Sequence, residues 1–155
     1  MNIRIAKVED IKQIKLLIDR NFDEIMSKFH SQSIVNKFKS HNALENLTSQ
    51  LTWKTIYVVE QDDKIIATGA FANFGTSDKP KYSISNMFVL PEFHSKGIGK
   101  IIFEQLLQNT KDMSADSFHV PSSRNAVAFY EKMGFIVDES QPDKDDEITW
   151  MTMKM

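Results

Sequence analysis

The chain has 155 residues, of which 41% are hydrophobic and 26% are charged, and its formal net charge is −2. This length fits one domain spanning residues 1–155, and so small a charge gives no electrostatic reason to expect a nucleic-acid partner. The lack of cysteine excludes disulfides and thiolate chemistry, and the histidines show no ligand spacing, so no metal is expected. No apolar run is long enough to cross a bilayer and no signal core is present, which predicts a cytoplasmic protein without a membrane partner.

The first third of the chain predicts a short strand followed by helices. Residues 2–6 alternate like a strand, and apolar side chains then recur at helical spacing over 11–29, with Asp10 as a candidate cap. A second apolar pattern over 34–51 predicts one or two further helices.

Strands dominate the middle of the chain, and strands and helices alternate at its end. The β-branched runs 56–60 and 65–71 flank Gln61-Asp62-Asp63-Lys64, a sequence typical of a hairpin turn. After a polar loop, the remaining pattern predicts strand, helix, strand, helix ended by Gly134, strand and strand, over residues 82–89, 99–111, 117–120, 124–133, 135–138 and 148–154. This order predicts an α/β (α+β) domain with a mixed sheet.

The segment Val89–Lys100 (Val-Leu-Pro-Glu-Phe-His-Ser-Lys-Gly-Ile-Gly-Lys) joins a predicted strand to a predicted helix. Pro91 ends the strand, because its ring nitrogen cannot donate to a ladder. Gly97 and Gly99 then let the backbone turn with its N–H groups exposed at the helix start, where unpaired amides and the positive helix end favour a phosphate. The segment therefore predicts a site for a pyrophosphate-bearing cofactor, or else an ordinary turn and helix cap.

Two familiar phosphate loops do not fit this segment. A Walker A loop has a glycine where His94 stands and a serine or threonine where Ile101 stands. A dinucleotide fingerprint has a third glycine where Ile102 stands. A nucleotide-binding domain is therefore disfavoured.

A second motif lies at residues 122–135 (Ser-Ser-Arg-Asn-Ala-Val-Ala-Phe-Tyr-Glu-Lys-Met-Gly-Phe). Together with Val89–Lys100 it resembles the two signature motifs of the GNAT superfamily of acetyl-CoA-dependent N-acetyltransferases, a Gln/Arg-x-x-Gly-x-Gly/Ala turn and an Ala-x-x-Phe/Leu-Tyr-Glu-Lys-x-Gly-Phe helix. The opening Ile3-Arg4-x-Ala6 and the closing 148–153 also look like that family. The resemblance implies a mixed, mostly antiparallel central sheet flanked by helices, with a splayed strand pair at the site of acetyl-CoA (coenzyme A).

The resemblance also implies which residues hold coenzyme A. The turn and helix start would cradle the pyrophosphate through His94, Ser95, Lys96, Gly97, Ile98, Gly99 and Lys100. Free peptide groups of Met87, Phe88 and Val89 would pair with the pantetheine arm like an added strand, and one amide would stabilise the oxyanion. Ser123 stands where many members carry Asn, and its hydroxyl would contact the arm; Asn125 lies off the Ser123–Tyr130 helix face and receives no role. His94 replaces the motif's Gln or Arg and supplies full charge only at lower pH.

Two residues are candidates for proton transfer. Tyr130 occupies the general-acid position of the family; the alternative is that it only packs with Phe129 and Phe135. His119 is a candidate general base because an imidazole titrates near neutrality. The alternative is that His119 is structural or solvated, and that water held by Ser83, Ser85 and Asn86 relays the proton instead.

The expected activity is transfer of the acetyl group from acetyl-CoA to a primary amine of a small molecule or peptide in a ternary complex. A non-catalytic acyl-CoA-binding or sensing module is the alternative. Candidate aromatic liners of the substrate pocket, most of which a core would also explain, are Phe22, Phe29, Phe38, Trp53, Phe74 and Trp150. The acidic turn 143–147 would attract cationic amines or simply be solvated. The amine itself, the acyl-chain preference and the assembly, with a homodimer among the options, are left open.

Overall fold

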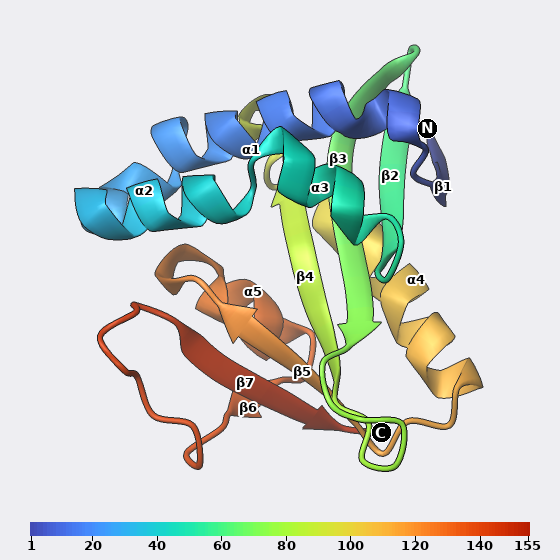
Figure 1. Cartoon of the computed structure of the whole chain (residues 1–155), viewed down its shortest axis with the longest axis vertical. Coiled ribbons are helices and arrows are strands. Elements are labelled where there is room, and N and C mark those ends of the chain that lie inside the picture. Colours follow the sequence, from blue (N-terminus) through green and yellow to red (C-terminus); the bar gives the residue numbers. More distant parts are fainter.

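The computed structural model describes all 155 residues, and Figure 1 shows a single twisted sheet with helices packed on it. The strands are β1 (Asn2–Ile5), β2 (Thr55–Gln61), β3 (Lys64–Asn73), β4 (Tyr82–Val89), β5 (Ser117–Ser122), β6 (Ile136–Val137) and β7 (Thr149–Lys154). The helices are α1 (Ile11–Glu24), α2 (Gln32–His41), α3 (Leu44–Gln50), α4 (Ile98–Asp112) and α5 (Val127–Lys132). Short 3₁₀ turns cover Val8–Asp10, Met26–Lys28, Pro91–Phe93 and Arg124–Ala126. None of the helices has the length and apolarity that crossing a bilayer requires.

The seven strands form one sheet in the order β1-β2-β3-β4-β5-β7-β6. All neighbouring strands run antiparallel except β4 and β5, which are parallel. That pair is joined in register only at Ser83 and His119, and Figure 1 shows the two strands diverging from this point. The expected mixed, mostly antiparallel sheet with a splayed pair is therefore confirmed.

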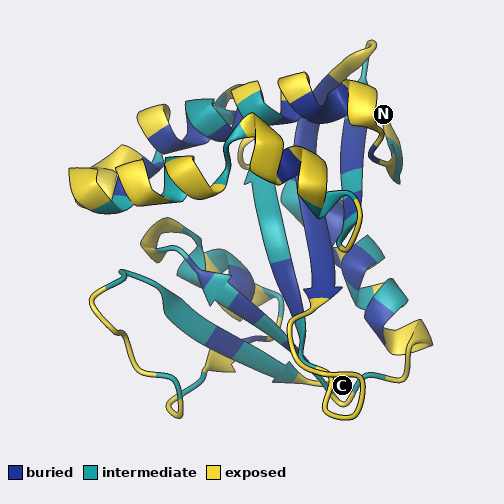
Figure 2. Cartoon of the chain, viewed as in Figure 1, coloured by how far each residue is buried: buried dark blue, intermediate teal, exposed yellow.

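The hairpin between β2 and β3 turns through two residues with positive φ, Asp62 at 52° and Asp63 at 61°. Such a two-residue turn matches the twist of the strands that it joins, and aspartate tolerates the left-handed region better than most residues. β3 lies inside the sheet between β2 and β4, and every residue from Ile65 to Ala72 is buried, as the dark band in Figure 2 shows. This explains why that strand is continuously small or apolar.

The position of α4 depends on Gly69 in β3. A side chain at this position would collide with the Cγ2 methyl group of Ile102, so the glycine lets α4 pack directly on the strand. The ladder between β3 and β4 also shifts register between Thr68 and Ala70, opposite Asn86, whose φ is 54°. Such bulges bend a strand and re-aim its side chains. The end of β4 and the start of α4 are thereby set beside the gap between β4 and β5.

The structure departs from the expected elements at three points. The helical pattern over 11–29 breaks at Glu24, and a 3₁₀ turn follows it. Asp10 does not cap α1 with its side chain; its carboxylate accepts the Lys7 N–H at 2.7 Å and pairs with Arg4 at 2.8 Å. The first turn of the expected helix at 124–133 is 3₁₀, so α5 begins at Val127, and Gly134, with φ at 107°, follows its end as predicted.

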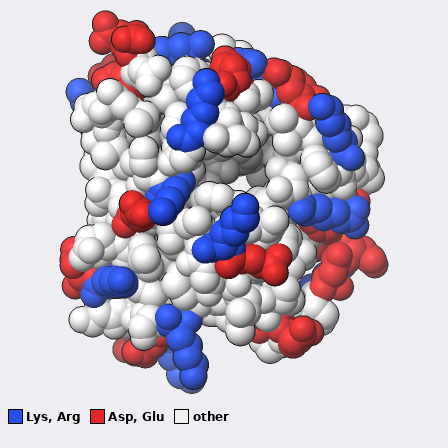
Figure 3. Space-filling model, turned by 180° about the vertical axis from the view of Figure 1, so that it is seen from behind, with Lys and Arg blue, Asp and Glu red and all other residues white.

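The charges are dispersed over the surface. Figure 3 shows the face opposite to that of Figure 1, where Lys and Arg side chains alternate with Asp and Glu and neither sign gathers into a large patch. This distribution agrees with the formal net charge of −2.

Candidate functional site

Two adjoining cavities occupy the space where β4 and β5 separate. The first cavity, of about 470 Å³, lies against the start of α4, and the second, of about 310 Å³, lies under α2 and α3. Both are lined by Met26, Met87, Phe88, Ser123, Ala126 and Tyr130. The two cavities therefore adjoin beside Tyr130.

The start of α4 presents free backbone amides to the first cavity. Gly97 takes the position before the helix with φ at 79°, and the direction in which a Cβ would project is open for 4 Å. The first intrahelical donor at this end is the Ile101 N–H, which bonds to the Gly97 carbonyl. The amides of Ile98, Gly99 and Lys100 have no helical acceptor and no capping side chain. These amides can hold an anion without desolvating a charged side chain.

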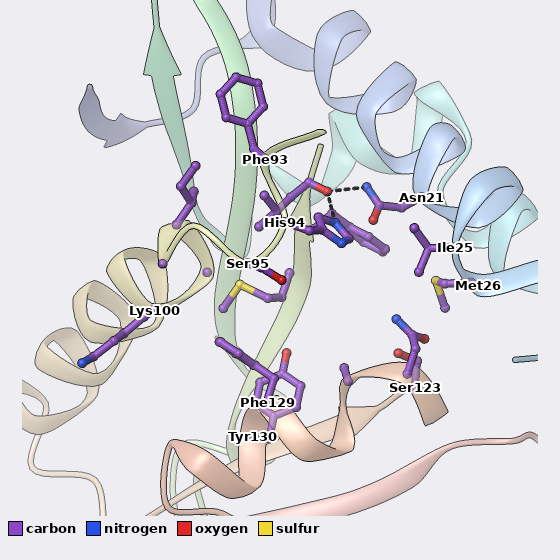
Figure 4. Close-up of a pocket in the computed structure, with 18 of the residues that line it drawn as sticks. Asn21, Ile25, Met26, Phe93, His94, Ser95, Lys100, Ser123, Phe129 and Tyr130 are labelled. Atoms are coloured by element: carbon purple, nitrogen blue, oxygen red, sulfur yellow. Dashed lines mark hydrogen bonds between the residues drawn. The ribbon is translucent and has the colours of Figure 1, made fainter. Parts of the chain in front are cut away.

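The edge of β4 forms one wall of the first cavity. Leu90 donates its N–H to Ile66 on β3 at 2.8 Å, so antiparallel alternation turns the peptide groups of Phe88 toward β3 and those of Met87 and Val89 into the gap. The Val89 carbonyl accepts from Asn21 Nδ2 at 2.9 Å and lies 2.7 Å from His94 Nε2, as the dashed lines in Figure 4 show. The expectation of free groups on all three residues therefore fails for Phe88 and for the carbonyl of Val89.

Tyr130 lies on α5 where the two cavities meet. Its ring is buried and packs edge-on against Phe129 and Phe135, with centroids 5.1 and 5.6 Å away. Figure 4 shows the hydroxyl directed into the cavity between Ser95 and Phe129. Burial raises the pKa of this phenol well above its usual value, so Tyr130 stays protonated at neutral pH. The Tyr130 side chain therefore carries its proton at neutral pH, and its ring packs in the core.

His119 lies outside both cavities. It stands opposite Ser83, at the point where β4 and β5 still pair, and its Nε2 lies 2.9 Å from Ser117 Oγ. Its Nδ1 is buried without a partner. Burial lowers the pKa of His119, Lys81 lowers it further, and Asp138 opposes them. The structure does not bring this imidazole together with Tyr130, whereas Ser85 and Asn86 do line the second cavity.

The remaining expected cofactor residues divide into two groups. His94, Ser95, Gly97, Ile98, Gly99, Lys100 and Ser123 line the first cavity. Lys96 is absent from the lining, and its Nζ lies 5.3 Å from the Phe93 ring centre; the Lys100 side chain points away from the cavity in Figure 4. Asn125, for which the sequence predicts no role, does line the first cavity. The expected α-helical spacing does not apply to it, because it lies in a 3₁₀ turn.

Lys54 is a site residue that the sequence did not reveal. It lines the second cavity, and its Nζ donates to Ser85 Oγ at 2.7 Å and to Asn86 Oδ1 at 3.0 Å. The same nitrogen lies 5.0 and 5.7 Å from the ring centres of Trp53 and Phe74. Burial lowers the pKa of Lys54 to about 8. A single lysine after a helix carries no motif, so no local pattern marked it.

Only some of the expected aromatic liners, and no residue of the acidic turn, line a cavity. Phe22 and Phe38 line the second cavity and Phe29 lines the first, whereas Trp53, Phe74 and Trp150 line neither. In the acidic turn, Glu147 accepts from Ser31 Oγ at 2.8 Å, lies 3.0 Å from His30 Nδ1 and approaches Arg124 at 3.5 Å. None of the acidic residues of this turn lines either cavity.

Comparisons with known proteins identify the family of the chain. Residues 25–155 match the family model described as an acetyltransferase (GNAT) domain. The uncharacterized N-acetyltransferase ycf52 of Pyropia yezoensis is 24% identical over 156 residues, which cover 88% of this chain and 87% of that protein.

Solved structures share the fold over almost the whole chain. The PaiA N-acetyltransferase of Thermoplasma acidophilum, in complex with coenzyme A, is 17% identical with a TM-score of 0.83 and full coverage of both chains. A predicted acetyltransferase of Clostridium acetobutylicum with acetyl-CoA is 21% identical with a TM-score of 0.68, and 92% of this chain and 94% of that one are covered. Because the family model matches residues 25–155, most of its length, the chain belongs to the GNAT family of acetyltransferase domains.

Proposed function

We propose that the protein is an N-acetyltransferase that moves an acetyl group from acetyl-CoA to a primary amine while both substrates are bound. The observation that carries this proposal is the junction of the two cavities at Tyr130. One cavity offers amides for a pyrophosphate, the other offers a separate space for an acceptor, and a protonated phenol lies between them.

The residues of the first cavity fit acetyl-CoA, the molecule class found with the two solved relatives. The amides of Ile98, Gly99 and Lys100 would hold the pyrophosphate, with the open space at Gly97 giving access to them. The arm would then follow β4 from Val89 toward Met87, pairing with the strand edge as an added strand. Ser123 and Asn125 line the opposite side of this path.

With the arm running from Val89 toward Met87, Met87 and Tyr130 have separate roles. The Met87 amide, farther from the pyrophosphate than Val89, donates to the thioester oxygen as it gains negative charge. The amine nitrogen forms the new bond to the acetyl carbon, the carbon–sulfur bond breaks, and Tyr130 protonates the leaving thiolate. We assign the proton lost by the amine to water, because the expected base, His119, lines neither cavity.

The test is incubation of the protein with acetyl-CoA and a broad panel of primary amines, with release of free coenzyme A followed by a thiol reagent. The proposal predicts release that depends on the amine. Tight coenzyme A binding without transfer to any amine would favour the sensing module instead, and tighter binding of ATP than of coenzyme A would favour a nucleotide-binding domain.

A further inference from the structure

The second cavity contains one cationic side chain of lysine or arginine type and no carboxylate. Lys54 is that cation, and no Asp or Glu lines the cavity. The other polar side chains of the lining are His41, Asn42, Gln50, Ser85, Asn86, Ser122, Ser123 and Tyr130. No ion pair of the structure involves Lys54.

The ammonium of Lys54 is incompletely compensated. Two of its three N–H donors reach neutral acceptors, Ser85 Oγ and Asn86 Oδ1, and the faces of Trp53 and Phe74 add weak attraction. The third N–H donor of the ammonium has no acceptor, and its positive charge has no anionic partner. A cation withdrawn from water in this way is destabilising unless an anion joins it. Burial of the same ammonium lowers the pKa of Lys54 to about 8.

The position of this cation relative to the reacting atoms limits what the anion is. Ser85 and Asn86 immediately precede Met87 on β4, and a strand rises about 3.3 Å per residue, so the lysine's anchors lie within roughly 7 Å of the proposed oxyanion donor. That separation matches an amine and an anionic group within one small molecule. The cavity volume of about 310 Å³ also suits a small molecule.

We infer that the acceptor is a small amino acid-like molecule whose carboxylate binds Lys54 and whose amine faces the Met87 edge of β4. The inference rests on the proposed acetyl transfer and names the substrate class of that site. Polyamines are excluded as preferred acceptors, because a second cation would approach Lys54 with no carboxylate nearby to receive it. Phe22, Phe38 and Ile84 in the same lining favour an apolar side chain on the acceptor.

The first experiment compares matched acceptors that differ only in the anionic group. Leucine, methionine and phenylalanine are each compared with the corresponding amino acid amide and decarboxylated amine, and spermidine is added as a polyamine. The carboxylates should show kcat/KM about 10- to 100-fold above their amides, the range for a hydrogen bond to a charged group. The amine of an amino acid amide is less basic than that of the free amino acid, so more of it is unprotonated at neutral pH. This difference favours transfer to the amides, and a preference for the carboxylates would therefore be seen in spite of it. Equal or better transfer to the amides or to spermidine overturns the inference.

Variants then assign the preference to Lys54. Lys54→Gln should reduce the carboxylate-to-amide ratio to near one, and Lys54→Arg should retain part of it. The matched control is Lys81→Gln, which removes a lysine lying 4.1 Å from the Trp150 ring centre but outside both cavities, and it should keep the wild-type ratio. A preference that survives Lys54→Gln overturns the assignment.

A binding measurement separates this inference from the proposed function. Calorimetry on the protein saturated with coenzyme A compares N-acetyl-phenylalanine with N-acetyl-phenylalaninamide, in wild type and in Lys54→Gln. Lys54-dependent binding of the carboxylate without transfer to any amine would contradict acetyl transfer and support the anion site. Transfer to amines without any carboxylate preference would support acetyl transfer and overturn the anion site. Circular dichroism and thermal melts check that each variant is folded.

Discussion

Asn21 on α1 donates from Nδ2 to the carbonyl oxygen of Val89, 2.9 Å away at the edge of β4, and the same nitrogen lies 3.0 Å from the Leu17 carbonyl. Asn21 is buried, so its amide ties the helix to the strand edge away from water. We expect Asn21→Ala to lower the free energy of unfolding by about 0.5–1.5 kcal/mol, because the Val89 carbonyl loses one of its two partners and keeps His94. Urea denaturation measures this, with the exposed Asn46→Ala as control, expected within about 0.5 kcal/mol of wild type. Equal losses of unfolding free energy in Asn21→Ala and Asn46→Ala would contradict a stabilising role of the bond between Asn21 and Val89.

Tyr130→Phe removes the proposed proton donor and keeps the ring. The contacts with Phe129 and Phe135 involve the ring, so folding and coenzyme A affinity should stay close to wild type. We expect kcat to fall by about 10²- to 10⁴-fold, the usual contribution of general acid catalysis. Steady-state release of coenzyme A together with calorimetric binding tests this. Tyr57→Phe, which alters a hydroxyl bonded to Asn109 outside both cavities, is the control. Full activity of Tyr130→Phe would leave the phenol with a packing role only.

The stability of the fold should respond to the titration of Lys54. Burial lowers its pKa from 10.5 to about 8, so between these two pH values the unfolded chain holds a proton that the folded chain has released. The free energy of unfolding therefore receives a contribution that rises with pH across this window. Chemical denaturation of wild type and Lys54→Met at several pH values isolates it, because the other titrating groups are common to both. A stability difference that does not change between pH 8 and 10 would contradict the burial of this ammonium.

Gly97→Ala should damage both the fold and the binding of coenzyme A. The residue has φ at 79°, which costs an alanine about 1 kcal/mol, and the added methyl group projects into the open space beside the α4 amides. Gly134→Ala is a matched control, since Gly134 also has positive φ, at 107°, but lies outside both cavities. Both variants should lose stability in thermal melts, and only Gly97→Ala should weaken coenzyme A binding. Comparable weakening in both variants would show that the effect is not local.

Gly69→Ala should destabilise the protein by about 1–3 kcal/mol, the usual cost of overpacking a core. The new methyl group would meet the Cγ2 of Ile102 and would also lie 3.2 Å from the Met87 sulfur. A double-mutant cycle with Ile102→Ala checks the cause by denaturant unfolding, since removing Cγ2 should make Gly69→Ala less harmful. Additive losses would place the strain elsewhere.

Much of the fold follows from short-range patterns. The hairpin at Asp62 and Asp63 and the turn at Gly97 depend on φ angles that neighbouring residues impose, so local sequence predicts both. The break after Glu24 was not predictable in this way, because the apolar spacing continues through Phe29 while the backbone changes to a 3₁₀ turn. Asp10 was misassigned for a related reason: its principal partner is Arg4, and a cap pattern does not include an ion pair with the preceding strand.

The candidate site also combines features that local sequence predicts with features that it does not. The sequence by itself determined the Gly97 turn and the helix that carries Tyr130, because each is a contiguous motif whose signals lie in its own residues. Only the tertiary structure decided that His119 lies away from the cavities, that Asn21 and His94 engage the Val89 carbonyl, and that Lys54 lies beside Ser85 and Asn86. Those relations join residues on separate elements, as Lys54 does with partners 31 and 32 positions along the chain. They depend on how α1, the end of α3 and the splayed strands pack, and no local spacing encodes that packing.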